Sequence, residues 1–508
     1  MEKTRTRRLL GNTLLLTAAA LIMRAIGVWF GALLEDRAGA QGVGLFSLLM
    51  SVYSLAATFG TAGLRLAAAR LTAEEVDARR RGGGVRRCFG LALLLGFSAC
   101  LLLYFSADLC AAAWLRDARA APALRLLAPS LPAAALSAVL SGYCKAAGAV
   151  LPYSAVQLTE QGIKIAVTLL ALGGAWHIST GDVSESVCAA MALGITAAEW
   201  LSLLMTLAVY AAWGRRSRRS TDEAKTPWRS LLRIAVPDGL GACARGGLLT
   251  AEHLLIPPGL RKSGADAQKA LASYGTIHGM SLPLLLYPSA VLSSLSSLLV
   301  PELARLRSLG GTRRIDFVAS RLIHLTLSFS LGSAAVFFAF APQLSLAVYG
   351  DYEAAHSLRL LAPLVPIMYL DMTVDGILKG LDEQKRVMRY NVLDSALCVL
   401  MVLLVLPPLG VKGYYLVLYA SELLNFFLSA NRLLSVSDAG LALWESIGKC
   451  LLCAGASWGI TRLLFGGAAE QMPPSLSAGI LIFFMAALYF AMLNAVSKKT
   501  NRLGALLK

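Results

Sequence analysis

The chain has 508 residues, of which 57% are hydrophobic and 15% charged, and its formal net charge is +17. With a mean hydropathy of +0.64, this composition excludes a soluble globular protein of this size and predicts a polytopic membrane protein. The positive charge fits either a nucleic-acid ligand or the inner loops of a membrane protein, and the positions of the basic residues decide between the two.

Apolar runs near the ~20 residues that a helix needs to cross a bilayer recur along the chain. They predict an all-α polytopic membrane protein with about fourteen transmembrane helices. The expected spans are, in chain order, 9–34, 44–69, 88–107, 124–144, 154–174, 186–212, 230–256, 274–300, 319–340, 359–379, 391–409, 413–431, 447–465 and 476–495. The connecting segments are too short for a soluble catalytic domain, and the sequence contains no P-loop, HExxH or GxSxG motif. We therefore expect a protein that is not an enzyme.

Residues 124–148 return 234 positions later as residues 358–382, which indicates an internal duplication. The residues that match without a gap are Arg125, Pro129, Pro132, Gly142 and Lys145 with Arg359, Pro363, Pro366, Gly376 and Lys379. Six helices per copy predict two lobes of the same orientation, related by a pseudo-twofold axis along the membrane normal. We expect a six-helix lobe over 1–228, a second over 229–438, and two additional helices with a cytoplasmic tail over 439–508.

The matched prolines fall within the fourth and tenth expected helices. Pro129 and Pro132, like Pro363 and Pro366, should bend these helices so that the lobes can hinge, although kinks that packing tolerates without motion explain them equally well.

Most of the 47 lysine and arginine residues lie on the inner side if the N-terminus is inside, which is the bias typical of membrane topology. Both termini are then cytoplasmic. The basic segments contain no interleaved aromatic residues that could stack on bases, so we expect contact with membrane lipids and no nucleic-acid partner.

Charged residues within the spans need a reason, because each costs about 2.5–3.5 kcal/mol at mid-span. Arg24 has no neighbouring carboxylate in its helix. The spacing of Gln157, Glu160, Gln161 and Lys164 places them on one helix face. The further charged residues are Arg65, Glu199, Asp238, Arg245, Glu252, Asp371, Asp375, Lys379, Asp394 and Glu422.

The distribution of these charges favours an anionic substrate and a coupling cation. The first lobe carries an excess of positive charge and the second a large excess of carboxylates, although Glu160 with Lys164 and Asp375 with Lys379 could also be structural ion pairs. The candidate substrate-binding residues are Arg24, Arg65, Glu160, Gln161, Lys164 and Arg245. The candidate coupling-ion residues are Asp238, Glu252, Asp371, Asp375, Asn391 and Asp394. We expect no cofactor apart from Na⁺ or H⁺ as the coupling ion, no catalytic residue and no certain metal site.

The repeat singles out Asp394 among these carboxylates. Gln157 and Glu160 correspond to Asn391 and Asp394, but the counterpart of Lys164 is Cys398, which cannot neutralise a carboxylate. Asp394 is therefore expected to hold the cation, with Asn391 as a neutral ligand and Asp238 as a second carboxylate. The alternative is that Asn391 and Asp394 only cap the start of a helix.

Three stretches carry a family resemblance. They are Glu160–Gln161 and Lys164 after SGYCKAAG, the run GLFSLLMSVYSLAATFGTAGLRLAAARL, and the run GMSLPLLLYPSAVLSSLSSLLVPELARL. Together they resemble the polysaccharide-exporter branch of the flippase superfamily, of the stage V sporulation protein B type and related to lipid II flippases. The resemblance covers most of the first twelve spans and is weak after residue 430.

This resemblance implies two six-helix lobes around a V-shaped cavity, alternating access, and a polyprenyl-diphosphate-linked saccharide as substrate in a bacterial plasma membrane. It places Arg24 where similar flippases have a cavity arginine. The run GMSLPLLLYP is apolar where lipid II flippases have a further arginine, which separates this chain from them. We expect a monomer that moves the saccharide from the inner to the outer leaflet.

Two other functions share parts of this pattern. A multidrug and toxic compound extrusion antiporter would have the same architecture, but a cationic drug would prefer acidic residues where Arg24 and Lys164 lie. A polytopic glycosyltransferase or polymerase would need a sizeable outer catalytic loop, which the sequence does not contain.

Overall fold

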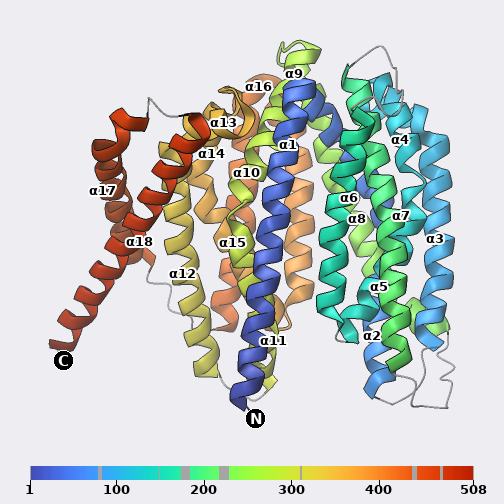
Figure 1. Cartoon of the computed structure of the whole chain (residues 1–508), viewed down its shortest axis with the longest axis horizontal. Helices are drawn as coiled ribbons and strands as arrows, with labels where there is room; N and C mark the ends of the chain where they lie inside the picture. Colours follow the sequence, from blue (N-terminus) through green and yellow to red (C-terminus); the bar gives the residue numbers. More distant parts are fainter. Residues whose placement is uncertain are drawn as a thin grey trace. The chain divides into compact units, whose positions relative to one another are not determined.

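The computed structural model describes residues 2–77, 83–147, 149–172, 183–216, 228–308, 312–437, 443–469 and 473–506. In these residues the regular structure is entirely helical (Figure 1). The prediction of an all-α membrane protein is confirmed.

The chain forms two compact units. One unit comprises Arg37–Ala272 and is called the first-copy unit here; the other comprises Met1–Asp36 with Ser273–Lys508 and is called the second-copy unit. Their borders are 236 residues apart, which is close to the 234-residue offset of the repeat. The first helix of each copy therefore groups with the body of the other copy. Because of this exchange the unit borders differ from the lobe borders expected after residues 228 and 438, and the six-helix lobes stay a prediction.

The first-copy unit contains the second part of α1 and the helices α2 to α8. Their bounds are α1 (Glu2–Thr61), α2 (Leu64–Asp77), α3 (Gly83–Leu109), α4 (Ala121–Leu127), α5 (Ser130–Ala146), α6 (Val150–Leu172), α7 (Val183–Arg216) and α8 (Trp228–Lys262), with a π-helix η1 (Cys110–Leu115) and a 3₁₀ helix η2 (Ala118–Ala120). Gly63 separates α1 from α2 with a φ of +65°, and a Cβ at this position would lie 2.1 Å from the carbonyl oxygen of Ala235. Only glycine allows this turn to touch the backbone of α8.

The second-copy unit contains the first part of α1 and the remaining helices. These are η3 (Gly275–Ser281), α10 (Leu282–Leu286), α11 (Ser289–Ser308), α12 (Thr312–Ala339), α13 (Ala341–Tyr349), α14 (Glu353–Leu361), η4 (Ala362–Leu364), α15 (Val365–Gly380), α16 (Gln384–Val436), α17 (Leu443–Ala469) and α18 (Pro474–Leu506); α9 (Ala267–Tyr274) crosses the border. The last two helices pack against each other (Figure 1).

Two very long helices each contain a break. α1 has 60 residues with non-helical angles at Gly39, and α16 has 53 residues with non-helical angles at Gly410, which follows Pro407 and Pro408. A straight helix of the length of α16 would extend about 80 Å, whereas the apolar core of a bilayer is about 30 Å thick. Each break therefore divides one continuous helix into two segments that are each long enough to cross a membrane.

Among the described residues, eight helices are long and apolar enough to cross a membrane, or nine if the bent pair α4 and α5 forms one span. The chain is thus a multi-span membrane protein. This count treats α1 and α16 as single helices, and it leaves out charged helices such as α8. Each expected span overlaps a helix of the structure, and the total of fourteen stays a prediction.

The repeated prolines break their helices as expected. Pro129 separates α4 from α5, which meet at 46°, and Pro363 lies in the short 3₁₀ helix η4 between α14 and α15. The bend at Pro129 is confirmed, and it arises because proline cannot donate the backbone hydrogen bond that continues a helix. At Pro363 the helix changes to 3₁₀ geometry, and a bend there stays a prediction. Their role as hinges stays a prediction.

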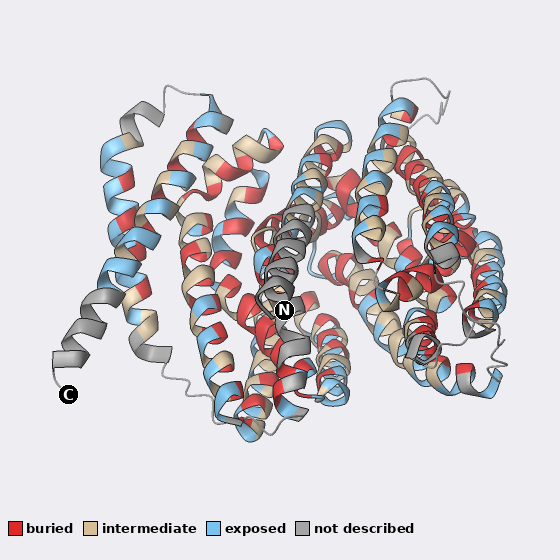
Figure 2. Ribbon diagram, turned by 60° about the horizontal axis from the view of Figure 1, so that its bottom comes forward, coloured by how far each residue is buried: buried red, intermediate tan, exposed pale blue. Residues whose placement is uncertain are grey.

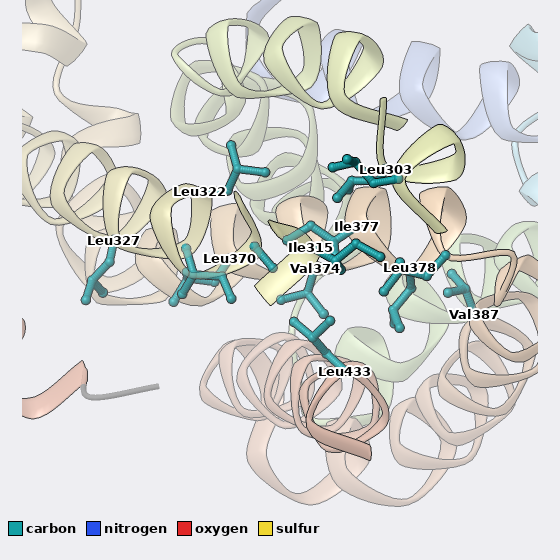
Figure 3. Packing of buried hydrophobic residues seen from close by; sticks show 14 residues of the cluster. Leu303, Ile315, Leu322, Leu327, Leu370, Val374, Ile377, Leu378, Val387 and Leu433 are labelled. Carbon is teal, nitrogen blue, oxygen red and sulfur yellow. The ribbon is translucent and has the colours of Figure 1, made fainter. Parts of the chain in front are cut away.

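Apolar packing holds each unit together and also covers its outside. Figure 3 shows a core cluster of the second-copy unit to which α11, α12, α15 and α16 contribute, with Leu303, Leu322, Val374 and Leu433 among its residues. On α3 of the first-copy unit, large apolar side chains such as Phe105 are exposed, that of Phe105 by 78%, and Figure 2 shows exposed residues along the outer faces of the helices. Such faces are typical of helices that contact lipid.

Candidate substrate and cation sites

Arg24 lies on α1 within the second-copy unit, where it contacts the break between α10 and α11. Its Nη1 donates to the carbonyl oxygen of Leu286 at 2.5 Å and to Oγ of Ser289 at 2.8 Å. The Leu286 carbonyl also accepts from Oγ of Ser289 at 2.8 Å. The guanidinium therefore stabilises the backbone where α10 ends and α11 begins.

Two tyrosines stabilise the same irregular segment. The hydroxyl of Tyr369 on α15 donates to the carbonyl of Leu285 at 2.6 Å, and that of Tyr349 on α13 donates to the carbonyl of Met280 at 2.9 Å. A broken helix is stable in a membrane only if its freed backbone groups find such partners.

An apolar cavity of about 550 Å³ lies in the second-copy unit, one residue along α1 from Arg24. Ala25, Val28 and Trp29 of α1 line it together with residues of α10, α12, α13 and α18. None of the described residues that line it is charged. Arg24 itself does not line this cavity, but its two acceptors, Leu286 and Ser289, flank lining residues in the chain.

The polar stripe on α6 pairs with α7 in the first-copy unit. Oε2 of Glu160 accepts a hydrogen bond from Oγ of Ser202 at 2.6 Å. Lys164 is within electrostatic reach of both Glu160 and Glu199, and Gln161 is partly buried beside them. The lysine thus counters two carboxylates.

The second-copy unit has a related but more acidic cluster. Nδ2 of Asn425 donates to Oδ2 of Asp371 at 2.9 Å and to Oδ1 of Asn391 at 3.5 Å. Oγ of Ser421 donates to Oδ1 of Asp394 at 2.7 Å. Oδ1 of Asp371 and Oδ1 of Asn425 are buried and have no hydrogen-bond partner among the described residues. Such oxygens suit a proton or a hard cation.

Asp375 belongs to the same face of α15 and forms one of the expected ion pairs. One carboxylate oxygen accepts from Oγ of Ser429 at 3.1 Å, and the other lies 3.8 Å from Nζ of Lys379. This geometry therefore fits the alternative that Asp375 and Lys379 form a structural ion pair.

The capping alternative for Asn391 and Asp394 is wrong. α16 begins at Gln384, so that both residues lie well inside the helix and not in its first turn. Glu383 precedes the helix, and Arg432 donates to both of its carboxylate oxygens, at 2.7 and 3.2 Å. This contact keeps the pKa of Glu383 below its ordinary value.

The remaining predicted residues lie in the first-copy unit. Asp238, Arg245 and Glu252 follow one another along α8, with Glu252 buried and Arg245 exposed. Because α8 and the Asn391–Asp394 pair belong to different units, the expected pairing of Asp238 with Asp394 stays a prediction. Arg65 is exposed near the start of α2.

Sequence reasoning missed the neutral partners of these charges. Ser202, Ser421 and Asn425 supply the hydrogen bonds, yet serines are frequent in this chain and do not stand out. A usable pattern was present: Glu199 precedes Ser202 by three residues, as Glu422 precedes Asn425.

Residues 9–244 match the model of a family described as polysaccharide biosynthesis protein. The chain is 24% identical to stage V sporulation protein B of Bacillus subtilis over an alignment of 504 residues, and this alignment covers 96% of each protein.

Solved structures of transporters share the fold. The lipid II flippase MurJ in an inward closed conformation superposes with a TM-score of 0.71 at 13% identity, over 96% of this chain and 99% of that one. An inward-facing multidrug resistance transporter of the MATE family gives a TM-score of 0.59 at 14% identity, over 82% of this chain and 95% of the other. The resemblance that the sequence suggested is confirmed.

Proposed function

Because residues 9–244 match the polysaccharide biosynthesis protein family and the chain is 24% identical to stage V sporulation protein B over 96% of its length, we propose that it is a flippase for a polyprenyl-diphosphate-linked saccharide. The substrate moves from the inner to the outer leaflet of the bacterial plasma membrane by alternating access. Its saccharide is a peptidoglycan precursor or a polysaccharide repeat unit.

The position of Arg24 supports this proposal most directly. A lipid diphosphate combines about two negative charges with a long apolar chain, and the second-copy unit contains both a guanidinium and an apolar cavity of about 550 Å³ that residues of the same helix line. Arginine suits a diphosphate because its planar fork binds two oxygens at once. Lys164 and Arg65 are the proposed anion contacts of the first-copy unit, with Glu160, Gln161 and Arg245 as further substrate-binding residues.

The acidic cluster supports coupling to a cation. Asp371, Asn391, Asp394 and Asn425 present oxygen atoms, two of them without a hydrogen-bond partner in the described structure. We propose that Na⁺ or H⁺ binds here, with Asp375 beside it, and that Asp238 and Glu252 are further candidates in the first-copy unit. The membrane potential adds about 2.3 kcal/mol per charge per 100 mV.

The same cluster favours a second candidate function, the export of a cationic drug in exchange for an ion. In that case the carboxylates would bind the substrate and Arg24 would only hold the helix break. A flippase would need Arg24 to move the lipid-linked saccharide, whereas a drug exporter would not need Arg24 to bind its substrate.

Proteoliposomes test both functions at once. Flipping of a fluorescent polyprenyl-diphosphate saccharide and uptake of a fluorescent cationic drug would be measured for the parent, Arg24→Ala, Arg24→Lys and the control Arg359→Ala, which removes an exposed arginine that stacks on Phe338. We expect Arg24→Ala to lose flipping, Arg24→Lys to recover part of it and Arg359→Ala to keep it. Normal flipping by Arg24→Ala, or drug transport without lipid flipping, would overturn the proposal.

The orientation of the termini is also a proposal, based on the distribution of basic residues. A reporter after Lys508 should be active only in the cytoplasm, and one inserted near Ser263 only outside. A C-terminus outside the cell would mean an odd number of spans and would contradict the prediction of two six-helix lobes with the same orientation.

A further inference from the structure

Two basic side chains lie together where α2 and α5 of the first-copy unit touch. A Cβ at Gly142 would lie 2.4 Å from the carbonyl oxygen of Arg65 and 3.0 Å from the backbone nitrogen of Ala69, so the two helices meet backbone to backbone. Lys145 follows Gly142 by three residues and therefore lies on the same face of α5. Arg65 and Lys145 are both exposed and within electrostatic reach of each other.

Among the described side chains, no carboxylate is paired with either of these cations. The neighbouring groups are hydroxyls: Tyr153, which is within electrostatic reach of Arg65, is hydrogen-bonded to Ser141. Glu160 also reaches Tyr153, but it accepts from Ser202 and lies beside Lys164. Two adjacent cations without a counter-charge favour the binding of an anion.

The second copy lacks this arrangement. The counterpart of Lys145 is Lys379, which lies 3.8 Å from the carboxylate of Asp375, and the counterpart of Asp375 in the first copy is Ser141. At the offset of 235 that relates Arg70 to Arg305, the counterpart of Arg65 is Val300. Both differences make the first copy more positive. Duplication thus provided the same lysine in both copies. In the first copy an arginine lies near this lysine, whereas in the second copy a carboxylate does.

We propose that Arg65 and Lys145, together with the hydroxyls of Ser141 and Tyr153, form a binding site for a diphosphate group. A guanidinium can bind two phosphate oxygens and the ammonium a third. The diphosphate carries about two negative charges, which matches the two cations, whereas a phospholipid phosphodiester carries one. The site would bind the head group of the proposed substrate. The identification of its natural ligand as a lipid diphosphate therefore rests on the proposed function.

Equilibrium binding of radiolabelled pyrophosphate tests the site itself. The full chain would be placed in phosphatidylcholine nanodiscs at low salt, and the double variant Arg65→Gln/Lys145→Gln compared with the control Lys379→Gln. We expect about tenfold weaker binding or more for the double variant, because charge-assisted hydrogen bonds are lost, and unchanged binding for the control. Parental affinity in the double variant, or equal loss in the control, would refute the site.

A second pair of variants leaves both basic residues in place. Ser141→Asp gives Lys145 the carboxylate partner that Lys379 has, whereas Ser141→Asn adds similar bulk without charge. Pyrophosphate binding should weaken about tenfold for Ser141→Asp and stay within about twofold for Ser141→Asn. Equal effects of the two substitutions would show that bulk and not charge matters, and the proposal would fail.

Competition distinguishes the source of the phosphate. A polyprenyl diphosphate in the nanodisc should displace pyrophosphate at a much lower mole fraction than phosphatidylglycerol does. Equal displacement by both lipids would mean a site for ordinary head groups and would contradict the diphosphate proposal. Flipping by the parent judges the proposed function separately: if the parent binds pyrophosphate through Arg65 and Lys145 but does not flip the lipid saccharide, the proposed function fails and the site remains.

Discussion

The two copies of the repeat share one hydrogen bond and differ in the charge beside it. Glu160 accepts from Ser202 at 2.6 Å in the first-copy unit, and its counterpart Asp394 accepts from Ser421 at 2.7 Å in the second. Lys164 follows one turn after Glu160, whereas Cys398 occupies the equivalent position after Asp394. The duplication has preserved the bonded carboxylate and changed what neutralises it.

This difference suggests that the lysine of the first copy takes the place of a cation. A tethered ammonium is always present, so the carboxylates near it need no exchangeable ion. In the second copy Asp371, Asp394 and Glu422 interact electrostatically with one another and have no lysine at the equivalent position. An exchangeable cation is the simplest way to balance their charges.

The largest effect should come from removing the second-copy carboxylate. Asp394→Asn keeps the shape of the side chain and loses its charge, so we expect transport to lose its dependence on an imposed sodium or proton gradient, with at least about a tenfold lower rate. Vesicles with imposed gradients measure this directly. The matched variant Glu160→Gln should keep the gradient dependence, and a parental response of Asp394→Asn would place the coupling site elsewhere.

Giving the second copy the lysine of the first should produce a smaller change. In Cys398→Lys the ammonium would neutralise Asp394 from one turn away, and we expect the gradient dependence to fall several-fold while the protein still folds. Cys398→Met controls for the bulk at this buried position. Size-exclusion chromatography would confirm folding before transport is compared, and an unchanged response of a folded Cys398→Lys would contradict the tethered-cation interpretation.

The smallest effect concerns packing at equivalent glycines. A Cβ at Gly142 would lie 2.4 Å from a backbone oxygen, whereas at Gly376 the nearest atoms belong to the side chain of Ser296, at 3.0 and 3.2 Å. Gly142→Ala should therefore destabilise by about 1–3 kcal/mol, while Gly376→Ala should destabilise less, because Ser296 needs to shift by only a few tenths of an ångström. Thermal unfolding in detergent compares the two, and similar melting temperatures would show that both contacts relax equally.

The sequence was sufficient for the class, the helices and the duplication. Apolar runs of membrane-spanning length determined an all-helical membrane protein, and the matched prolines located the breaks before α5 and α15. It also identified Glu160 and Asp394 as equivalents, because insertions do not disturb the register between residues 124 and 164. These features depend on residues near one another in the chain.

Tertiary contacts decided the rest, since they join residues that are far apart in sequence. The sequence marked Arg24 as a buried charge, but only the folded chain brings it to the helix break at Leu286, where neighbouring residues line an apolar cavity. The serines that hold Glu160 and Asp394 and the exchange of first helices between the copies have the same origin. Arg65 and Lys145 likewise come within electrostatic reach of each other because Gly142 lets α2 and α5 approach, and no local pattern contains that information.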